Sequence, residues 1–298
     1  MTQNKCCRHG ASLRRRRRRR RKILRSIIFS CSIIAVAVFV AVGSRMITSG
    51  DGGTNRYDVE AGNNTYNNAV IENSKISEKN KIQNEQSMLD DIMNSTQYPK
   101  QLQELALKNE EALEFVYDYP TEHVKEHTID LTEEASMDSV PLFVQWDKRW
   151  GYEKYSGNFF AASGCGPTTL SMVVVYLTHN RDASPIAVAK YSKEAGYSVD
   201  GSGSSWTLIS EGCRHYGVKA KTVALDESRM KAEIDAGHPI VVNVGPGDFT
   251  DTGHFMVITG YDDEGFSIND PNSIEKSGKR WLFKNISSQI RAVWSMYV

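Results

Sequence analysis

A cysteine flanked by two glycines begins the part of the sequence that could do chemistry. Cys165 stands in the run ASGCGPTTL, where Pro167 suits an early helical position, so a helix is predicted to begin at Cys165. The unpaired N–H groups of a helix N-terminus stabilise negative charge and lower the pKa of a thiol placed there. Cys165 is therefore the candidate nucleophile, and the adjacent glycines leave its sulfur approachable by a substrate backbone.

A thiolate nucleophile needs a base, and the base needs an acceptor that orients it. His254 opens a predicted strand, and Asp270 follows the next strand sixteen residues later. A three-residue hairpin loop at 263–265 would put both side chains on one face, offset along the ladder, so that a bulge or strand twist must bring them together. Asn269 is an alternative partner for His254.

Acyl chemistry at a thiol also requires hydrogen-bond donors for an oxyanion, normally the backbone N–H of the nucleophile and one side-chain amide. Gln145, twenty residues before Cys165 in the run PLFVQWD, is the best candidate for the amide. Asn158 is the alternative.

The elements that must position these residues read as helices first and strands later. The patterns predict helices over 165–178, 184–195, 205–216 and 227–236 and strands over 219–224, 239–244, 254–261 and 265–269. This order indicates an α+β class with an antiparallel sheet. Cys213 falls within the third helix pattern, and we expect it to be a buried structural residue.

Four runs in order make a pattern more specific than any one of them: VPLFVQWDKRWG, ASGCGPTTLSMVV, AGHPIVVNV and GHFMVITGYDDEGFSINDP. Together they resemble the C39-like family of papain-fold peptidases over residues 140 to about 296, within a predicted domain of 139–298. The resemblance implies a papain-like fold and a cysteine peptidase, with Cys165 as nucleophile, His254 as base, Asp270 as its orienter and Gln145 as oxyanion donor. Relatives in that family remove leader peptides at a double-glycine site and are fused to ABC exporters, whereas no G-x-x-x-x-G-K-[ST] loop occurs here.

The formal net charge of zero conceals a basic tip on an acidic body. Residues 1–25 hold twelve Lys and Arg side chains and no acid, which leaves 24 basic against 36 acidic residues beyond them. The acidic body would repel phosphates, and no aromatic residue interleaves with the Arg run, so we predict no nucleic-acid partner.

Cysteine usage argues against a disulfide scaffold and against a metal centre. Of five cysteines, Cys165 and Cys213 follow the first 43 residues, and one bridge between them would be chemically permissible. No C-x-x-C or H-E-x-x-H motif occurs, so we predict no metal site and no cofactor.

Residues 26–43 carry no charge, and their length is near the minimum for a helix that spans a bilayer. The basic tip at 1–25 places the N-terminus in the cytoplasm, which predicts a single-pass cell-membrane protein with its remaining chain outside. The alternative is a cleaved signal peptide, since 41–43 resembles a processing site.

Two segments of different composition lie between the apolar run and the domain. Residues 44–95 are polar and predict a flexible stalk, with weak helix over 76–92. Residues 96–138 predict a helical segment and a connector, with one amphipathic helix or two short ones between Tyr98 and Tyr119. This segment could pack on the domain or occupy its cleft as an inhibitor.

Three functions remain open from the residues alone. The first is a membrane-tethered thiol peptidase that cuts peptides or proteins. The second is a transpeptidase or amidase, in which an amine resolves the same acyl-enzyme at Cys165. The third is a peptide-binding module without catalysis.

Overall fold

The computed structural model describes residues 57–298, with side chains from residue 75 onward. The chain divides into two units, residues 1–73 and 74–298. Among the described helices, none combines the length and the apolar character that a bilayer-spanning helix requires. The predicted basic tip at 1–25 and the predicted transmembrane helix at 26–43 lie outside the described residues.

Helix α2 (Tyr57–Asn94) lies where the sequence predicted a flexible stalk with weak helix, and residues 44–56 of that stalk lie outside the described part of the chain. No proline interrupts α2, so a continuous helix is sterically permitted. Its residues 75–84 are all exposed, whereas Ile92 near its end is fully buried. Packing at its C-terminal end therefore stabilises this helix.

The predicted helical segment that follows is broken into short pieces. The break falls at Asn109, whose backbone is extended and whose side chain accepts a hydrogen bond from the N–H of Glu111. Leu102 and Phe115 are buried in one apolar cluster with Phe159 of the following domain, so the segment packs on that domain. The pieces are α3 (Lys100–Lys108), η1 (Glu110–Ala112), α4 (Leu113–Tyr117) and α5 (Tyr119–Glu122), and η2 (Glu134–Ser136) follows in the connector.

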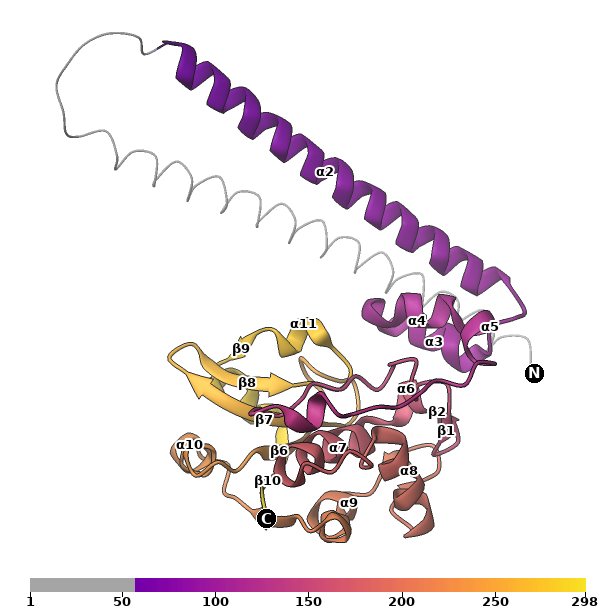
Figure 1. Cartoon of the computed structure of the whole chain (residues 1–298), viewed down its shortest axis with the longest axis vertical. Helices are drawn as coiled ribbons and strands as arrows, with labels where there is room; N and C mark the ends of the chain where they lie inside the picture. The colour runs from indigo at the N-terminus through magenta and orange to yellow at the C-terminus, as the bar shows by residue number, and fades with distance from the viewer. Residues whose placement is uncertain (1–56) are drawn as a thin grey trace, which may run out of the picture. The chain divides into compact units, whose positions relative to one another are not determined.

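The domain consists of helices followed by a six-stranded antiparallel sheet of order β5-β10-β6-β7-β8-β9, which confirms the predicted combination of helices and antiparallel sheet (Figure 1). The sheet strands are β5 (Lys219–Thr222), β6 (Ile240–Val244), β7 (His254–Asp262), β8 (Gly265–Asn269), β9 (Arg280–Trp281) and β10 (Ile290–Tyr297). Two small hairpins precede the sheet, formed by β1 (Lys154–Tyr155) with β2 (Asn158–Phe159) and by β3 (Ser198–Val199) with β4 (Gly203–Ser204).

The four predicted helices are present, but the third is interrupted. It breaks at Glu211, whose φ of −127° and ψ of −46° lie outside the helical range. The helices of the domain are α6 (Phe160–Ser163), α7 (Cys165–Thr178), α8 (Pro185–Glu194), α9 (Thr207–Ser210), η3 (Gly212–Tyr216), α10 (Glu227–Asp235), α11 (Ile274–Ser277), α12 (Phe283–Ile286) and η4 (Ser287–Gln289).

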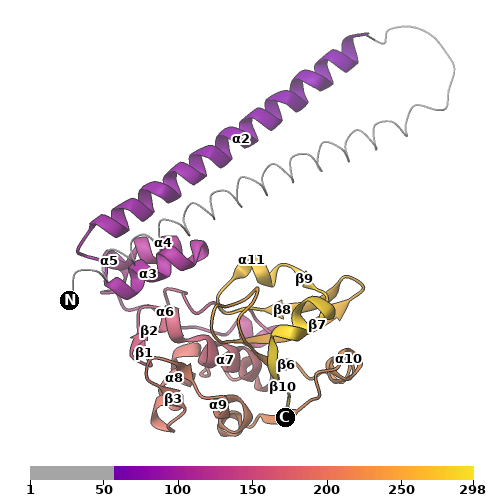
Figure 2. The same ribbon diagram turned by 180° about the vertical axis from the view of Figure 1, so that it is seen from behind.

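Helix α7 packs in the middle of the domain (Figure 2). Every residue from 166 to 175 is buried, as expected for a helix that is apolar all round. Phe255 and Val257 of β7 share one core with α7, while Met256 and Ile258 belong to a second core with residues of α10 and α12. Alternate side chains of β7 therefore pack into two different cores, and this requirement fixes the register of the strand.

Candidate active site

Cys165 is the first residue of α7, as the sequence predicted, and it is partly exposed. This position leaves its backbone N–H without an intrahelical acceptor. The sulfur makes a hydrogen bond with the His254 side chain and accepts from the backbone N–H groups of Phe255 and Gly166. Burial by itself raises the pKa of the Cys165 thiol, but these hydrogen bonds and the charge of His254 outweigh it, and the pKa is lowered. The site therefore favours a thiolate.

The glycines beside Cys165 have a packing role that the sequence did not reveal. A Cβ on Gly164 would lie 2.6 Å from the ring of Phe160, and one on Gly166 would lie 2.5 Å from Oγ of Ser204. Side chains of the domain itself thus fill the space beside each glycine. Both residues must lack a side chain for these neighbours to approach the start of α7.

His254 is the first residue of β7 and is buried, with 6% of its surface exposed. Its Nε2 lies 2.6 Å from Oδ1 of Asp270, which leaves Nδ1 for the sulfur of Cys165. Burial opposes the charged imidazole, but the charge and hydrogen bond of Asp270, with those of Cys165, outweigh burial and raise the pKa of His254 to about 10. Opposite pKa shifts on the two partners favour a thiolate–imidazolium ion pair.

The hairpin between β7 and β8 differs from the predicted one. Its loop has two residues, Asp263 and Glu264, because Asp262 pairs with Gly265, so the predicted three-residue loop is wrong. The register of the two strands then shifts by one residue, which leaves Thr259 as the extra residue of a β-bulge. The sequence could not show this bulge, although it required either a bulge or a strand twist.

The shifted register explains the contact between His254 and Asp270. Val257 pairs with Asn269, the last residue of β8, so the same register continued by one residue would set Asp270 opposite Met256, on the same face as His254. Without the bulge, Asp270 would lie opposite Val257 and project from the other face. The bulge therefore puts the carboxylate on the face that the histidine occupies.

Asp270 is fully buried and held on several sides. Its Oδ1 also accepts from the N–H of Asn272 at 2.8 Å, and its own N–H donates to Oγ of Ser277 at 2.9 Å. Its Oδ2 is buried without a hydrogen-bond partner among the described residues. This carboxylate is thus fixed toward His254 and shielded from solvent.

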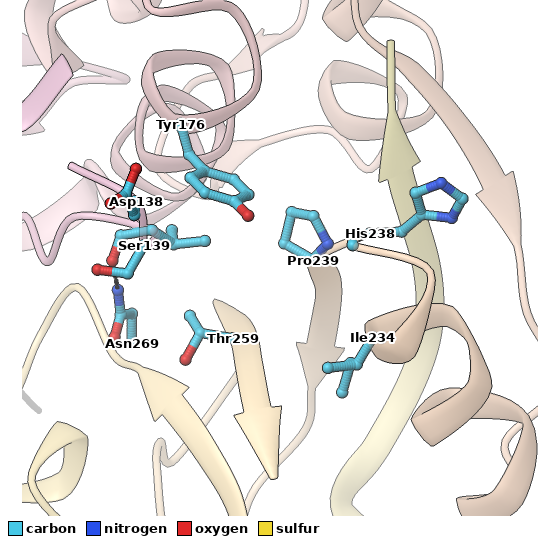
Figure 3. Close-up of a pocket in the computed structure, with 10 residues that line it drawn as sticks. Asp138, Ser139, Tyr176, Ile234, His238, Pro239, Thr259 and Asn269 are labelled. Carbon is cyan, nitrogen blue, oxygen red and sulfur yellow. Dashed lines mark hydrogen bonds between the residues drawn. The ribbon is translucent and has the colours of Figure 1, made fainter. Parts of the chain in front are cut away.

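Asn269, the alternative partner for His254, makes different contacts. Its Nδ2 donates to the carbonyls of Val140 and Pro141, each at 3.0 Å. It lines a pocket of about 310 Å³ (Figure 3), to which neither the candidate nucleophile nor the candidate base contributes. The structure therefore pairs His254 with Asp270 and not with Asn269.

Gln145 is buried, and its bonds connect it to chain segments that adjoin Cys165 and Asp270. Its Nε2 donates to the carbonyl of Ala161 at 2.7 Å, four residues before Cys165. Its backbone N–H donates to the carbonyl of Pro271 at 2.7 Å, directly after Asp270. The second hydrogen on Nε2 is the donor that the predicted oxyanion role requires.

Asn158 is the alternative amide, and its Oδ1 accepts a hydrogen bond from the backbone N–H of Phe159 at 2.7 Å. It lies in the β1–β2 hairpin, and it makes no hydrogen bond to Cys165, His254 or Asp270 among the described residues. Gln145 therefore has the stronger structural link to the site.

Sequence reasoning missed Ser204 as a neighbour of Gly166, the residue after Cys165. Its Oγ lies 2.7 Å from the hydroxyl of Tyr155, which in turn lies 2.8 Å from Oγ of Ser192. Tyr155 is 2% exposed, as expected for a core residue, and burial raises the pKa of its hydroxyl. Ser204 lies in a run of Gly and Ser that carries no local signal for a position beside the start of α7.

Three solved structures are similar to about half of the chain. The peptidase domain of Streptococcus ComA, a bi-functional ABC transporter involved in a quorum sensing pathway, is 18% identical with a TM-score of 0.39, over 53% of this chain and 96% of that one. A putative C39-like peptidase from Bacillus anthracis is 16% identical with a TM-score of 0.34, over 53% and 95%. A double glycine motif protease from an AMS/PCAT transporter, in complex with the leader peptide, is 18% identical with a TM-score of 0.34, over 54% and 91%.

No curated protein matches the sequence. The model of the Peptidase_C39 like family matches residues 137–298, which is more than half of the chain and the whole of the sheet domain. The family match covers Cys165, His254 and Asp270, whose side chains the structure joins in one hydrogen-bonded series. The chain therefore belongs to the Peptidase_C39 like family.

Proposed function

We propose that this chain is a membrane-anchored, extracytoplasmic cysteine peptidase that hydrolyses peptide bonds through Cys165, His254 and Asp270, with Gln145 as oxyanion donor. One observation carries the proposal: His254 bonds both the sulfur of Cys165 and Oδ1 of Asp270, and the pKa of the thiol is lowered while that of the imidazole is raised. That combination is the ion pair on which thiol peptidases depend.

The reaction follows from the positions of the protons. The Cys165 thiolate attacks the carbonyl carbon of the scissile peptide bond, and its backbone N–H with Nε2 of Gln145 donates to the oxyanion that forms. The imidazolium of His254 gives its proton to the leaving amine, and the C–N bond breaks to leave a thioester on Cys165. Neutral His254 then takes a proton from water, whose oxygen attacks the thioester and releases the acid and the thiolate.

Asp270 stabilises the imidazolium throughout this sequence. Its carboxylate lies 2.6 Å from Nε2 of His254, which fixes the ring with Nδ1 toward the sulfur. Because Asp270 is fully buried, solvent does not compete for that hydrogen bond.

The apolar run at 26–43 and the basic tip at 1–25 support the proposed location. Protease added to intact cells that express the full chain should remove the peptidase domain and leave a short fragment in the membrane fraction. A domain that is protected in intact cells and digested after lysis would contradict the proposed orientation.

Activity is tested by incubating the full chain with a mixed peptide library and identifying the products by mass spectrometry. We expect new termini with the unmodified chain and none with Cys165→Ala, while Cys213→Ser keeps the activity. Addition of a primary amine separates hydrolysis from acyl transfer, because a transpeptidase or amidase would join the amine to the new carboxyl terminus. Peptide binding without cleavage by a folded chain would instead support a binding module.

A further inference from the structure

A short turn of the N-terminal helical segment contacts the loop that carries Asp270. The turn comprises Asn109, Glu110 and Glu111, between α3 and α4, and the loop comprises residues 270–275. The hydrogen-bonded residues of the two lie 162 to 164 positions apart in the sequence, and the turn precedes the family match at 137–298. The contact thus joins the matched domain to a segment that lies outside the family match.

The carboxylate of Glu111 caps the loop where it becomes helix α11. Its Oε2 accepts from the backbone N–H of Ile274 at 2.7 Å and from that of Glu275 at 3.0 Å. Its Oε1 accepts from the hydroxyl of Ser273. One side chain therefore receives three hydrogen bonds from consecutive residues, and its charge suits the unpaired N–H groups of a helix N-terminus.

Asn109 binds the preceding residue of the same loop. Its Nδ2 donates to the backbone carbonyl of Asn272 at 2.9 Å and to Oδ1 of Asn272 at 3.1 Å. Trp146 Nε1 donates to the same backbone carbonyl at 3.3 Å from the side of the domain. The loop is therefore held between the turn and the segment that carries Gln145.

The bound loop is in direct contact with the carboxylate of Asp270. The N–H of Asn272 donates to Oδ1, the oxygen that also meets His254. The N–H of Ser273 donates to the carbonyl of Asp270 at 3.1 Å. A displacement of 272–275 would thus move the acceptor that orients the histidine.

The charged groups around the turn have other partners. Lys279 pairs with Glu275 at 2.6 Å, and Lys276 lies over the ring of Phe249. Within residues 75–298, Glu111 has no Lys, Arg or His within ion-pair distance, so backbone N–H groups and one hydroxyl hold its carboxylate.

We propose that Glu111 is a positioning residue for the active site, which fixes the 270–275 loop and thereby holds Asp270 against His254. Asn109 assists by fixing Asn272. The inference rests on the proposed function, because it assigns Glu111 a role through the hydrogen-bonded series of the nucleophile, the base and its carboxylate. It also gives the N-terminal helical segment a supporting role in the site, in place of the inhibitory one.

The test is the pH dependence of iodoacetamide labelling of the full chain, read separately for Cys165 and Cys213 by peptide mass spectrometry. Glu111→Ala should lower the Cys165 rate about tenfold at mildly acidic pH and move its midpoint to higher pH, which corresponds to about one pKa unit. Glu111→Gln, which keeps a hydrogen-bond acceptor for the N–H of Ile274, should restore part of the rate. Glu110→Ala is the matched control, because Glu110 is the exposed neighbouring glutamate, and it should behave as the unmodified chain.

Cys213 reports folding in the same experiment, because it is fully buried and should stay unlabelled in every folded variant. An unchanged Cys165 midpoint in folded Glu111→Ala would overturn the inference. Labelling of Cys213 in Glu111→Ala would show that this variant is unfolded. The inference then depends on Glu111→Gln and Asn109→Ala, whose Cys165 labelling midpoints should also lie at higher pH than that of the unmodified chain. Slow labelling of Cys165 in the unmodified chain would instead refute the proposed function.

Discussion

The two cysteines of the domain have the same side chain and opposite surroundings. Cys165 begins α7, is partly exposed, and has a lowered thiol pKa because of His254 and two backbone N–H groups. Cys213 lies in η3 with no exposed surface, and burial raises the pKa of its thiol to about 11. Both are free thiols, so the bridge that the sequence permitted does not join them.

The difference shows that the environment decides what a cysteine can do. Burial acts on both thiols in the same direction, and only at Cys165 do specific partners outweigh it. The role of nucleophile proposed for Cys165 depends on this difference, whereas Cys213 is a small apolar residue of the core. Substitution of either cysteine, or of the partners of Cys165, should therefore change the difference in reactivity between the two thiols.

Replacement of each cysteine should give the largest difference. Cys165→Ala removes the nucleophile and should lower the peptide-cleavage rate by roughly 10⁴-fold or more. Cys213→Ser should leave that rate unchanged and lower the free energy of unfolding by about 1–3 kcal/mol, because it buries a hydroxyl group among apolar residues. Rate assays and denaturant titration of the two variants measure both effects, and residual cleavage by Cys165→Ala near the original rate would exclude Cys165 as nucleophile.

Replacement of the orienting carboxylate should have the next largest effect. Asp270→Asn removes the charge that stabilises the imidazolium of His254 and should lower kcat/KM by roughly 10²- to 10⁴-fold. Asn269→Ala is the control, because its amide bonds Val140 and Pro141 and not His254. Comparable losses in both variants would assign the effect to strand β8 as a whole.

Gln145→Ala should lower kcat by about 10²- to 10³-fold, since it removes a donor to the oxyanion of the transition state. The same change should leave the alkylation rate of Cys165 nearly intact, because alkylation forms no oxyanion. Asn158→Ala should change neither quantity. A fall in alkylation that matches the fall in kcat would instead show that Gln145 supports the thiolate.

The pH profile of kcat/KM should be bell-shaped. The lowered pKa of Cys165 shifts the acidic limb below the ordinary thiol value, and the raised pKa of His254 shifts the basic limb above the ordinary imidazole value. Outside this window the rate should fall about tenfold per pH unit. The labelling rate of Cys213 should rise only when the pH approaches the raised pKa of its own thiol. A profile centred on the ordinary values of both groups would contradict the ion pair.

Local sequence patterns predicted that a helix begins at Cys165, and α7 begins there. Pro167 and the apolar run after Cys165 define the start of α7, and Ser184 caps α8 where a helix was expected. His254 and Asp270 lie at a strand start and directly after a strand, as predicted. These positions depend on residues that are neighbours in the chain, so the sequence alone was sufficient.

Features that depend on distant contacts were not predictable. The bulge at Thr259 depends on how two strands pair, and strand β10, between β5 and β6 in the sheet, was not assigned. The bonds of Glu111 to Ile274 join residues with no local relation in sequence. Helix α2 exceeds the weak helix expected at 76–92, because its polar residues give no amphipathic signal.

Alkylation of Cys165 and Cys213 by iodoacetamide, in the full chain at mildly acidic pH, tests the activated thiolate without any substrate. We expect Cys165 to react much faster than Cys213. His254→Ala should slow Cys165 by about tenfold or more, since a loss of one pKa unit alone accounts for that factor. Equal and slow labelling of both cysteines in the folded chain would contradict an activated thiolate at Cys165.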